Sequence, residues 1–324
     1  MPARDWEFPA EVRPNVKDVA FDLDATLSAV VHVRAEVPQD AFTAATLGTE
    51  RDGNGVVIRE DGLVLTIGYL ISEAETVWLT TSKGGAASGH VLGYDQSTGF
   101  GLVQALGKLD VPALERGGSQ SCAVGDLVIV AGYGGQRHAL QARIASKREF
   151  AGYWEYVLDE AIFTLPAHPQ WGGAALIGRD GKLLGIGSLL VQGVAESGEQ
   201  VDANMIVPID LLDPILDDLL RFGRSTRPPR PWLGMYTTET NEGPTVVSLA
   251  PGGPAHRAEV HAGDRVAAVA GQPIRGLADL YRKIWALGPA GVEVPLTLVR
   301  EGDTFAVRIG SANRDDFLKK PHLH

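Results

Sequence analysis

The sequence is poor in the features that mark several large protein classes. Cys122 is the only cysteine among 324 residues, so no disulfide can form within the chain and nothing marks an oxidising compartment. No run of 18 apolar residues occurs, which excludes a membrane-spanning helix. Basic residues are also scarce, with 29 Lys and Arg against 40 Asp and Glu. The resulting net charge of −11 argues against nucleic acid or an anionic membrane as the main partner.

The N-terminus lacks the basic start and apolar run of a secretory signal peptide. We therefore expect a cytoplasmic protein, or a periplasmic one if a leader has been removed. No sequence motif indicates a metal ion or a cofactor. Without a partner motif, Cys122 is expected to be a packed thiol and not a nucleophile.

The part of the sequence from Leu27 onward consists largely of short apolar runs separated by turn residues. Hairpins are predicted around Asp61-Gly62 and around Asp180-Gly181, because Asp-Gly between apolar runs favours a tight turn. Many short strands without long helices between them indicate an all-β barrel or sandwich. The other strands are predicted at residues 29–33, 76–80, 90–94, 100–103 and 126–130.

A helix and a stiff linker separate this β region from a second domain. The helix is predicted over 211–222 from its apolar spacing, with Asp210 as N-cap. Residues 224–231 are rich in proline and arginine, as expected of an extended spacer. We predict five segments: an N-terminal arm, a β domain, a linker, a small α+β domain and a polar tail, over residues 1–26, 27–222, 223–231, 232–310 and 311–324.

Several short motifs occur together in one order. Gly53 to Ile58 followed by Asp61 to Thr66 resembles G-S-G-F-V-I…D-G-Y-I-L-T, and Val124-Gly125-Asp126 resembles V-G-D. Gly185-Ile186-Gly187 resembles G-I-N, and Ala262 to Val266 resembles A-G-D-x-I. With this order, the chain resembles the HtrA (DegP-like) family of PDZ serine proteases over about residues 27–310. The resemblance implies a mainly β fold, a chymotrypsin-like double six-stranded β-barrel followed by an α+β PDZ domain.

The same resemblance places the catalytic triad on residues that cannot perform its chemistry. The family's histidine corresponds to Tyr69, its aspartate to Gly99 and its serine to Trp171. A tyrosine with a pKa near 10 is a poor base, glycine has no carboxylate, and indole has no nucleophilic oxygen. A fourth position, Pro169, replaces a glycine whose N–H lines the oxyanion hole, and proline has no N–H. The sequence therefore predicts a catalytically inactive pseudoprotease.

An active serine endopeptidase with a relocated site stays open as the alternative. Ser188 directly follows the Gly185-Ile186-Gly187 motif, and His168 lies three residues before Trp171. Asp159 and Glu160 are near in sequence. We expect His168, which precedes a proline, to be exposed or capping, and Ser188 to be a sheet hydroxyl. No G-x-S-x-G elbow occurs in the sequence.

The second domain retains the residues for which the resemblance implies peptide binding. Trp232-Leu233-Gly234-Met235 resembles the PDZ carboxylate loop, whose backbone N–H groups hold a peptide's terminal carboxylate. The helix with Leu280 and Ile284 would form the facing wall, although both residues could equally be core. The partners implied are peptides or the C-termini of client proteins.

Aromatic residues are concentrated in two places. Those at 150–156 and Trp171 are expected either to fill the inactive cleft, which we favour, or to maintain a groove for unfolded segments. Trp6 and Phe8 could form a homotrimer, as the N-terminal arm does in the family, or could fold back on the barrel. The predicted function is a scaffold, holdase or protease regulator that binds peptides through the PDZ domain. A purely structural role stays open.

Overall fold

The computed structural model describes residues 6–194 and 200–319. These residues form two compact units. The first unit comprises residues up to 148, residues 160–225 and the chain from Lys319, and the second comprises residues 149–159 and 226–318. The last part of the predicted polar tail, residues 320–324, lies outside the described residues.

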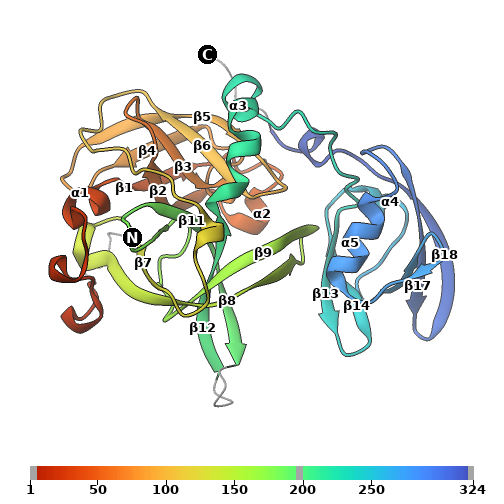
Figure 1. Cartoon of the computed structure of the whole chain (residues 1–324). Helices are drawn as coiled ribbons and strands as arrows, with labels where there is room; N and C mark the ends of the chain where they lie inside the picture. Colours follow the sequence, from red (N-terminus) through yellow and green to blue (C-terminus); the bar gives the residue numbers. More distant parts are fainter. Residues whose placement is uncertain (1–5, 195–199, 320–324) are drawn as a thin grey trace. The chain divides into compact units, whose positions relative to one another are not determined.

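The first unit begins with a closed six-stranded barrel (Figure 1). Its strand order is β1-β2-β3-β6-β5-β4, with all neighbours antiparallel. The predicted hairpin at Asp61-Gly62 joins β2 to β3, and Gly62 has the positive φ of 83° that such a turn requires. The strands are β1 Val30–Glu36, β2 Glu50–Val57, β3 Leu63–Ile67, β4 Thr76–Thr80, β5 Ala86–Tyr94 and β6 Phe100–Ala105.

A second closed barrel follows, in the order β10-β11-β12-β9-β8-β7. Its interior is apolar, and the side chains include Val130, Leu176 and Ile206, which are all fully buried. Cys122 belongs to the same cluster, and burial raises the pKa of its thiol, so the prediction of a packed thiol is confirmed. The strands are β7 Leu127–Ala131, β8 Ala139–Gly152, β9 Tyr156–Leu165, β10 Ala175–Ile177, β11 Leu183–Val194 and β12 Gln200–Pro208.

The helix after the second barrel, α3, runs from Asp213 to Phe222 and ends at Gly223 in the left-handed conformation. Asp210 does not cap it, so that prediction was wrong. The chain first makes a 3-10 turn at Ile209–Leu211, and the Asp210 carboxylate instead accepts hydrogen bonds from Ser119 Oγ and Gln120 N. A carboxylate accepts hydrogen bonds from any donors nearby, and for Asp210 these donors lie in the segment at Ser119 and Gln120 and not at the start of α3.

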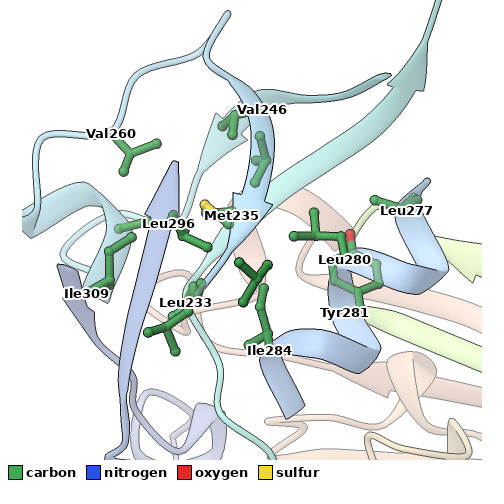
Figure 2. Close-up of a cluster of buried hydrophobic side chains, with 14 of the residues drawn as sticks. Leu233, Met235, Val246, Val260, Leu277, Leu280, Tyr281, Ile284, Leu296 and Ile309 are labelled. Atoms are coloured by element: carbon green, nitrogen blue, oxygen red, sulfur yellow. The ribbon is translucent and has the colours of Figure 1, made fainter. Parts of the chain in front are cut away.

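The main body of the second unit is the predicted small α+β domain. Its sheet has the order β13-β14-β15-β17-β18, with β13 at one edge. Leu233, Met235, Leu280 and Ile284 lie in its apolar core (Figure 2). The elements are β13 Met235–Thr240, β14 Gly243–Leu249, α4 Pro254–Arg257, β15 Arg265–Val269, β16 Gln272–Pro273, α5 Leu277–Trp285, β17 Glu293–Arg300 and β18 Asp303–Gly310. The predicted mainly β fold, a double barrel followed by an α+β domain, is confirmed.

The N-terminal segment packs on the first unit and contributes to its core. Phe8 donates its backbone N–H to Arg137 O, and Trp6 lies edge-on to His138. A short helix, α1 Leu23–Ser28, is capped by the Asp22 side chain and buries Leu23. The predicted N-terminal arm therefore contributes a buried core residue, Leu23. A four-residue helix, α2 Ala44–Leu47, lies between β1 and β2.

None of the helices within residues 6–194 and 200–319 combines the length and apolar character that crossing a bilayer requires.

Candidate functional sites

The loop of residues 166–173 is held rigidly by Asn54 of β2. Asn54 Nδ2 donates to Gln170 O at 2.9 Å and to Gly172 O at 3.0 Å, and its backbone N–H also reaches Gly172 O. The Asn54 side chain is buried, and its Oδ1 accepts from Tyr133 N at 2.7 Å. At Gly173, φ is +76° and a Cβ would lie 1.8 Å from Asn54 O, so only glycine fits. The loop is thus fixed by both side-chain and backbone hydrogen bonds.

His168 is fully buried inside this loop, so the expectation of an exposed or capping residue was wrong. Its Nε2 donates to His138 O at 2.9 Å, and its Nδ1 accepts from Gln170 N at 3.0 Å. Its backbone forms two more bonds to the Asn204 amide, which is also fully buried. Burial lowers the pKa of His168 to about 4. Both ring nitrogens of the neutral imidazole therefore form hydrogen bonds with backbone groups, which makes His168 a structural residue.

The positions predicted to replace the catalytic histidine and serine lie together. The Tyr69 hydroxyl donates to Ser188 O at 2.9 Å and is also hydrogen-bonded by the Trp171 side chain. It is so close that a Cβ on Gly172 would lie 2.8 Å from it. Burial raises the pKa of the Tyr69 hydroxyl well above its usual range. This hydroxyl stays protonated at neutral pH and cannot accept a proton from a nucleophile.

Gly99, at the position of the family's aspartate, contacts the residue before Tyr69 through its backbone. Gly68, the residue before Tyr69, donates its N–H to Gly99 O at 2.6 Å. Gly99 has φ +85°, in the left-handed region where an L-residue is strained. The turn that contains it is closed by Asp95, whose carboxylate accepts from Thr98 N at 2.8 Å. The local backbone suits glycine, which adopts this conformation without strain.

The groups considered for a relocated triad form hydrogen bonds and ion pairs with other residues. Ser188 is buried in β11, and its backbone oxygen accepts from Tyr69. Asp159 pairs with Arg282 at 2.5 Å, and Glu160 pairs with Lys147 at 2.9 Å. His168 bonds only to backbone groups and to Asn204 among the hydrogen bonds found in the described residues.

The predicted carboxylate loop of the small α+β domain presents its N–H groups to a single carboxylate. Glu155 Oε1 accepts from Gly234 N at 2.7 Å and from Met235 N at 3.1 Å. The Leu233 N–H lies 3.2 Å from Oε1 and 3.1 Å from Oε2. Gly234 has φ +73°, which lets three successive N–H groups converge. Glu155 was not among the predicted site residues, and no local sequence signal marks a carboxylate that acts on residues about 80 positions away.

The other predicted binding residues surround this loop. Trp232 is 6% exposed and packs against Phe317 in a tilted arrangement with ring centroids 4.8 Å apart, while Leu280 and Ile284 on α5 are fully buried in the core that Figure 2 shows. The six predicted peptide-binding residues therefore lie in one domain, and all six are buried.

The aromatic residues at 150–156, which were expected to fill the cleft, pack on one another and on a residue of the small α+β domain. Tyr153, at the tip of the β8–β9 hairpin, packs against Tyr236 of β13 with ring centroids 6.0 Å apart. Phe150, Trp154 and Tyr156 pack on one another. The side chain of Trp171 remains partly exposed. Residues 149–159, which include the turn between β8 and β9, belong to the second unit.

Within residues 6–194 and 200–319, no cluster of three or more His, Cys, Asp or Glu side chains has the arrangement needed to hold a metal ion.

Two family models match the chain. One, a trypsin-like peptidase domain, matches residues 53–186, and the other, a PDZ domain, matches residues 231–310. The chain thus combines a trypsin-like peptidase domain with a PDZ domain. Residues 53–186 include the three positions Tyr69, Gly99 and Trp171, and residues 231–310 include the loop that holds Glu155.

Curated relatives show the same combination over most of the chain. A probable periplasmic serine endoprotease DegP-like of Pseudomonas fulva is 26% identical over 299 residues, which is 86% of this chain and 61% of that protein. One of the same description from Chlamydia muridarum is 25% identical and covers 77% of this chain and 52% of its own length. The chain thus spans little more than half the length of these relatives. Their names overturn the expectation of a cytoplasmic location.

Solved structures share the fold. The HtrA-type protease AlgW with a decapeptide superimposes with a TM-score of 0.53 and 17% identity, covering 92% of this chain and 99% of AlgW. A serine endoprotease from Yersinia pestis gives a TM-score of 0.51 and 22% identity, covering 91% and 98%. At these identities, the similarity establishes the fold and nothing finer.

Proposed function

We propose that the protein is an HtrA-like pseudoprotease that binds peptides or client C-termini through its PDZ domain and acts as a scaffold, holdase or protease regulator. The names of its relatives support a periplasmic location. The single observation that carries the proposal is the site formed by Tyr69, Gly99 and Trp171. Tyr69 and Trp171 are hydrogen-bonded to each other, and Gly99 holds the backbone beside Tyr69.

These replacements remove proton transfer and nucleophilic attack together. An oxyanion hole without a triad still supplies roughly 10³–10⁴-fold catalysis over water in a serine protease. Pro169 lacks the N–H that the resemblance assigns to that hole, so even this remainder is weakened. The hydrogen bonds of Tyr69 with Ser188 O, and of Asn54 with Gln170 O and Gly172 O, support the proposal, because they occupy polar groups around these positions.

A serine-directed fluorophosphonate probe tests the inactive site. We expect no labelling of the purified chain under conditions that label an active HtrA-type protease to one probe per subunit. Heat-denatured chain serves as the control for non-specific reaction. Stoichiometric labelling of the native chain would show that a reactive serine exists and would contradict the proposal.

The second candidate function is an active serine endopeptidase with a relocated site, favoured by the names of the relatives. Ser188 is the serine that the sequence suggested for a relocated site, and its backbone oxygen accepts a hydrogen bond from Tyr69. Labelling that maps to a peptide containing Ser188 and disappears in Ser188→Ala favours this candidate. A matched Ser121→Ala variant, which changes an exposed serine of the same unit, should leave any labelling unchanged.

Peptide binding by the PDZ domain is tested separately, with fluorescent decapeptides that end in a free carboxylate or in an amide. Recognition by loop N–H groups requires the free carboxylate. Equal binding of the two peptides would contradict recognition through Leu233–Met235. Light scattering of the chain with and without residues 1–20 tests the proposed homotrimer, in which Trp6 and Phe8 would take part.

A further inference from the structure

The PDZ carboxylate loop is occupied by a residue of the same chain. Glu155 is 7% exposed, and its two carboxylate oxygens receive the N–H groups of three successive loop residues at 2.7–3.2 Å. The C-terminal carboxylate of a bound peptide requires these same donors. One set of N–H groups cannot serve both carboxylates at once.

The strand edge beside the loop is occupied as well. β13 is an edge strand, which a peptide could extend by β-augmentation. Thr237 of β13 donates its N–H to Tyr153 O at 2.9 Å, two residues before Glu155. The turn Tyr153–Glu155 therefore supplies both a backbone acceptor for the strand and a carboxylate for the loop.

Three further contacts hold this turn in the second unit. Val157 is 7% exposed and belongs to the same apolar core as Leu233 and Ile284. Arg282 of α5 forms ion pairs with Glu149 on β8 and Asp159 on β9, one on each strand of the hairpin. Exposed pairs of this kind contribute little energy, but a cation between both strands fixes the orientation of the turn.

The backbone of the turn fits this role. Glu155 has φ +61°, a left-handed conformation that is uncommon outside glycine, asparagine and aspartate. Such a conformation persists where the surrounding contacts determine it. Here the determining contacts are the four N–H···O interactions of its own side chain.

We propose that Glu155 is a built-in ligand of the PDZ domain, a side-chain carboxyl group that occupies the place of a peptide C-terminus and must leave before a C-terminal peptide can bind. The competition with peptide rests on the proposed peptide-binding function. The occupancy of the loop by Glu155 does not.

The competition is measured by the affinity for a fluorescent decapeptide that ends in an apolar residue with a free carboxylate. An internal ligand lowers the fraction of binding-competent domains, and the apparent Kd rises in inverse proportion. We expect Glu155→Ala to bind the peptide at least about tenfold more tightly than the wild-type chain, with Glu155→Gln in between. Glu160→Gln removes a carboxylate of the same hairpin that pairs with Lys147, and it should bind like the wild type.

The occupancy is measured without any peptide, by amide hydrogen exchange at Leu233–Met235. Hydrogen-bonded N–H groups are protected from exchange. We expect exchange at these three amides to be at least about tenfold faster in Glu155→Ala than in the wild type, with no change in Glu160→Gln. The amide of Leu296, on the interior strand β17, serves as the control for global unfolding.

The two measurements separate the two proposals. Faster exchange without peptide binding by any variant would support Glu155 as the occupant and contradict the peptide-binding function. Equal exchange in Glu155→Ala and the wild type would overturn the internal ligand, whatever the peptide does. Faster exchange with peptide affinity equal to that of the wild type would overturn the competition.

Discussion

At the scale of the single residue, the proposed loss of proteolysis depends on what Tyr69, Gly99 and Trp171 can do chemically. The Tyr69 hydroxyl is a donor to Ser188 O, and burial raises its pKa far above neutrality. Gly99 offers only its backbone, in a left-handed conformation. Restoring one group therefore leaves the others missing, and the effects of triad members are strongly non-additive.

The first prediction concerns Trp171→Ser. We expect the variant to show no fluorophosphonate labelling, because Tyr69 cannot take the proton of the new hydroxyl and Gly99 cannot orient a base. The control is Trp78→Ser, which changes an exposed tryptophan on β4. Labelling of Ser at position 171, absent from the control, would show that a general base exists within reach.

The second prediction follows from the buried neutral imidazole of His168. Its pKa is lowered from 6.5 to about 4 by burial, so the folded state binds the proton less readily than the unfolded state. The stability is complete above about pH 6.5 and falls as the pH drops toward about 4, by about 2 kcal/mol at pH 5. Urea unfolding of His168→Gln should show a smaller loss between pH 7 and pH 5. His32→Gln, which changes a partly exposed histidine, should keep the full loss.

The third prediction concerns the pH dependence of peptide binding. Burial raises the pKa of Glu155 from 4.5 to about 7, while the N–H groups of Leu233–Met235 and the charge of Arg314 oppose the shift. Tyr281 on α5 and Tyr236 on β13 also face this carboxylate, and burial raises the pKa of each, so both stay neutral. The occupied loop thus holds a proton more readily than the free turn, and raising the pH through this range weakens the docking of Glu155.

We therefore expect the wild-type chain to bind a C-terminal peptide at least about tenfold more tightly at pH 8 than at pH 5. A carboxyl terminus has a pKa near 3.5 and stays ionised throughout. Fluorescence anisotropy across this range measures the effect, with Glu155→Ala as the variant in which it should vanish. Tighter binding of the wild type at pH 5 would contradict the sign.

At the scale of the element, the loop of residues 166–173 shows which parts of the site the sequence could predict. The Gly172-Gly173 pair and the apolar residues after it mark the loop in the sequence, and Gly173 is where only glycine fits against Asn54. The burial of His168 was missed, because a histidine before a proline carries no local sign that the Asn204 amide, 36 residues later, closes over its backbone.

The fourth prediction is that Asn54→Ala destabilises the first unit. The change removes the bonds to Gln170, Gly172 and Tyr133 and leaves their backbone groups without these partners. Each unsatisfied buried group costs about 1–3 kcal/mol, so we expect a loss of about 2–4 kcal/mol in all. Thermal or urea unfolding measures it, and Asn241→Ala, at an exposed turn, should change stability by less than about 0.5 kcal/mol.

The β8–β9 hairpin is the element that sequence patterns predicted least well. Its strand β8 alternates only in part between buried and exposed residues, β9 is exposed only at Asp159 and Glu160, and the turn contains Tyr153 and Trp154. An aromatic-rich segment indicated burial but not its partner. That partner is the PDZ loop, about 80 residues later, and a long-range contact of this kind depends on the length of the strands and not on a local motif.

At the scale of the whole molecule, the fold could be predicted because the barrels and the PDZ domain each have local signals. The hairpin turns and the helix expected around Leu280 and Ile284 lie where the structure places turns and α5. The location was wrongly predicted, because the expectation relied on the composition of the first residues, whereas the relatives are named periplasmic.

The central claim is that the barrel unit keeps the scaffold of a peptidase without its catalytic groups. Its most direct test is the degradation of a denatured, unstructured protein by purified chain, followed over many molar equivalents of substrate. We expect no more cleavage than with a preparation of Ser188→Ala, and no product above the level of the buffer control. Cleavage with multiple turnovers, retained through purification to homogeneity and absent from a matched control preparation, would contradict the account.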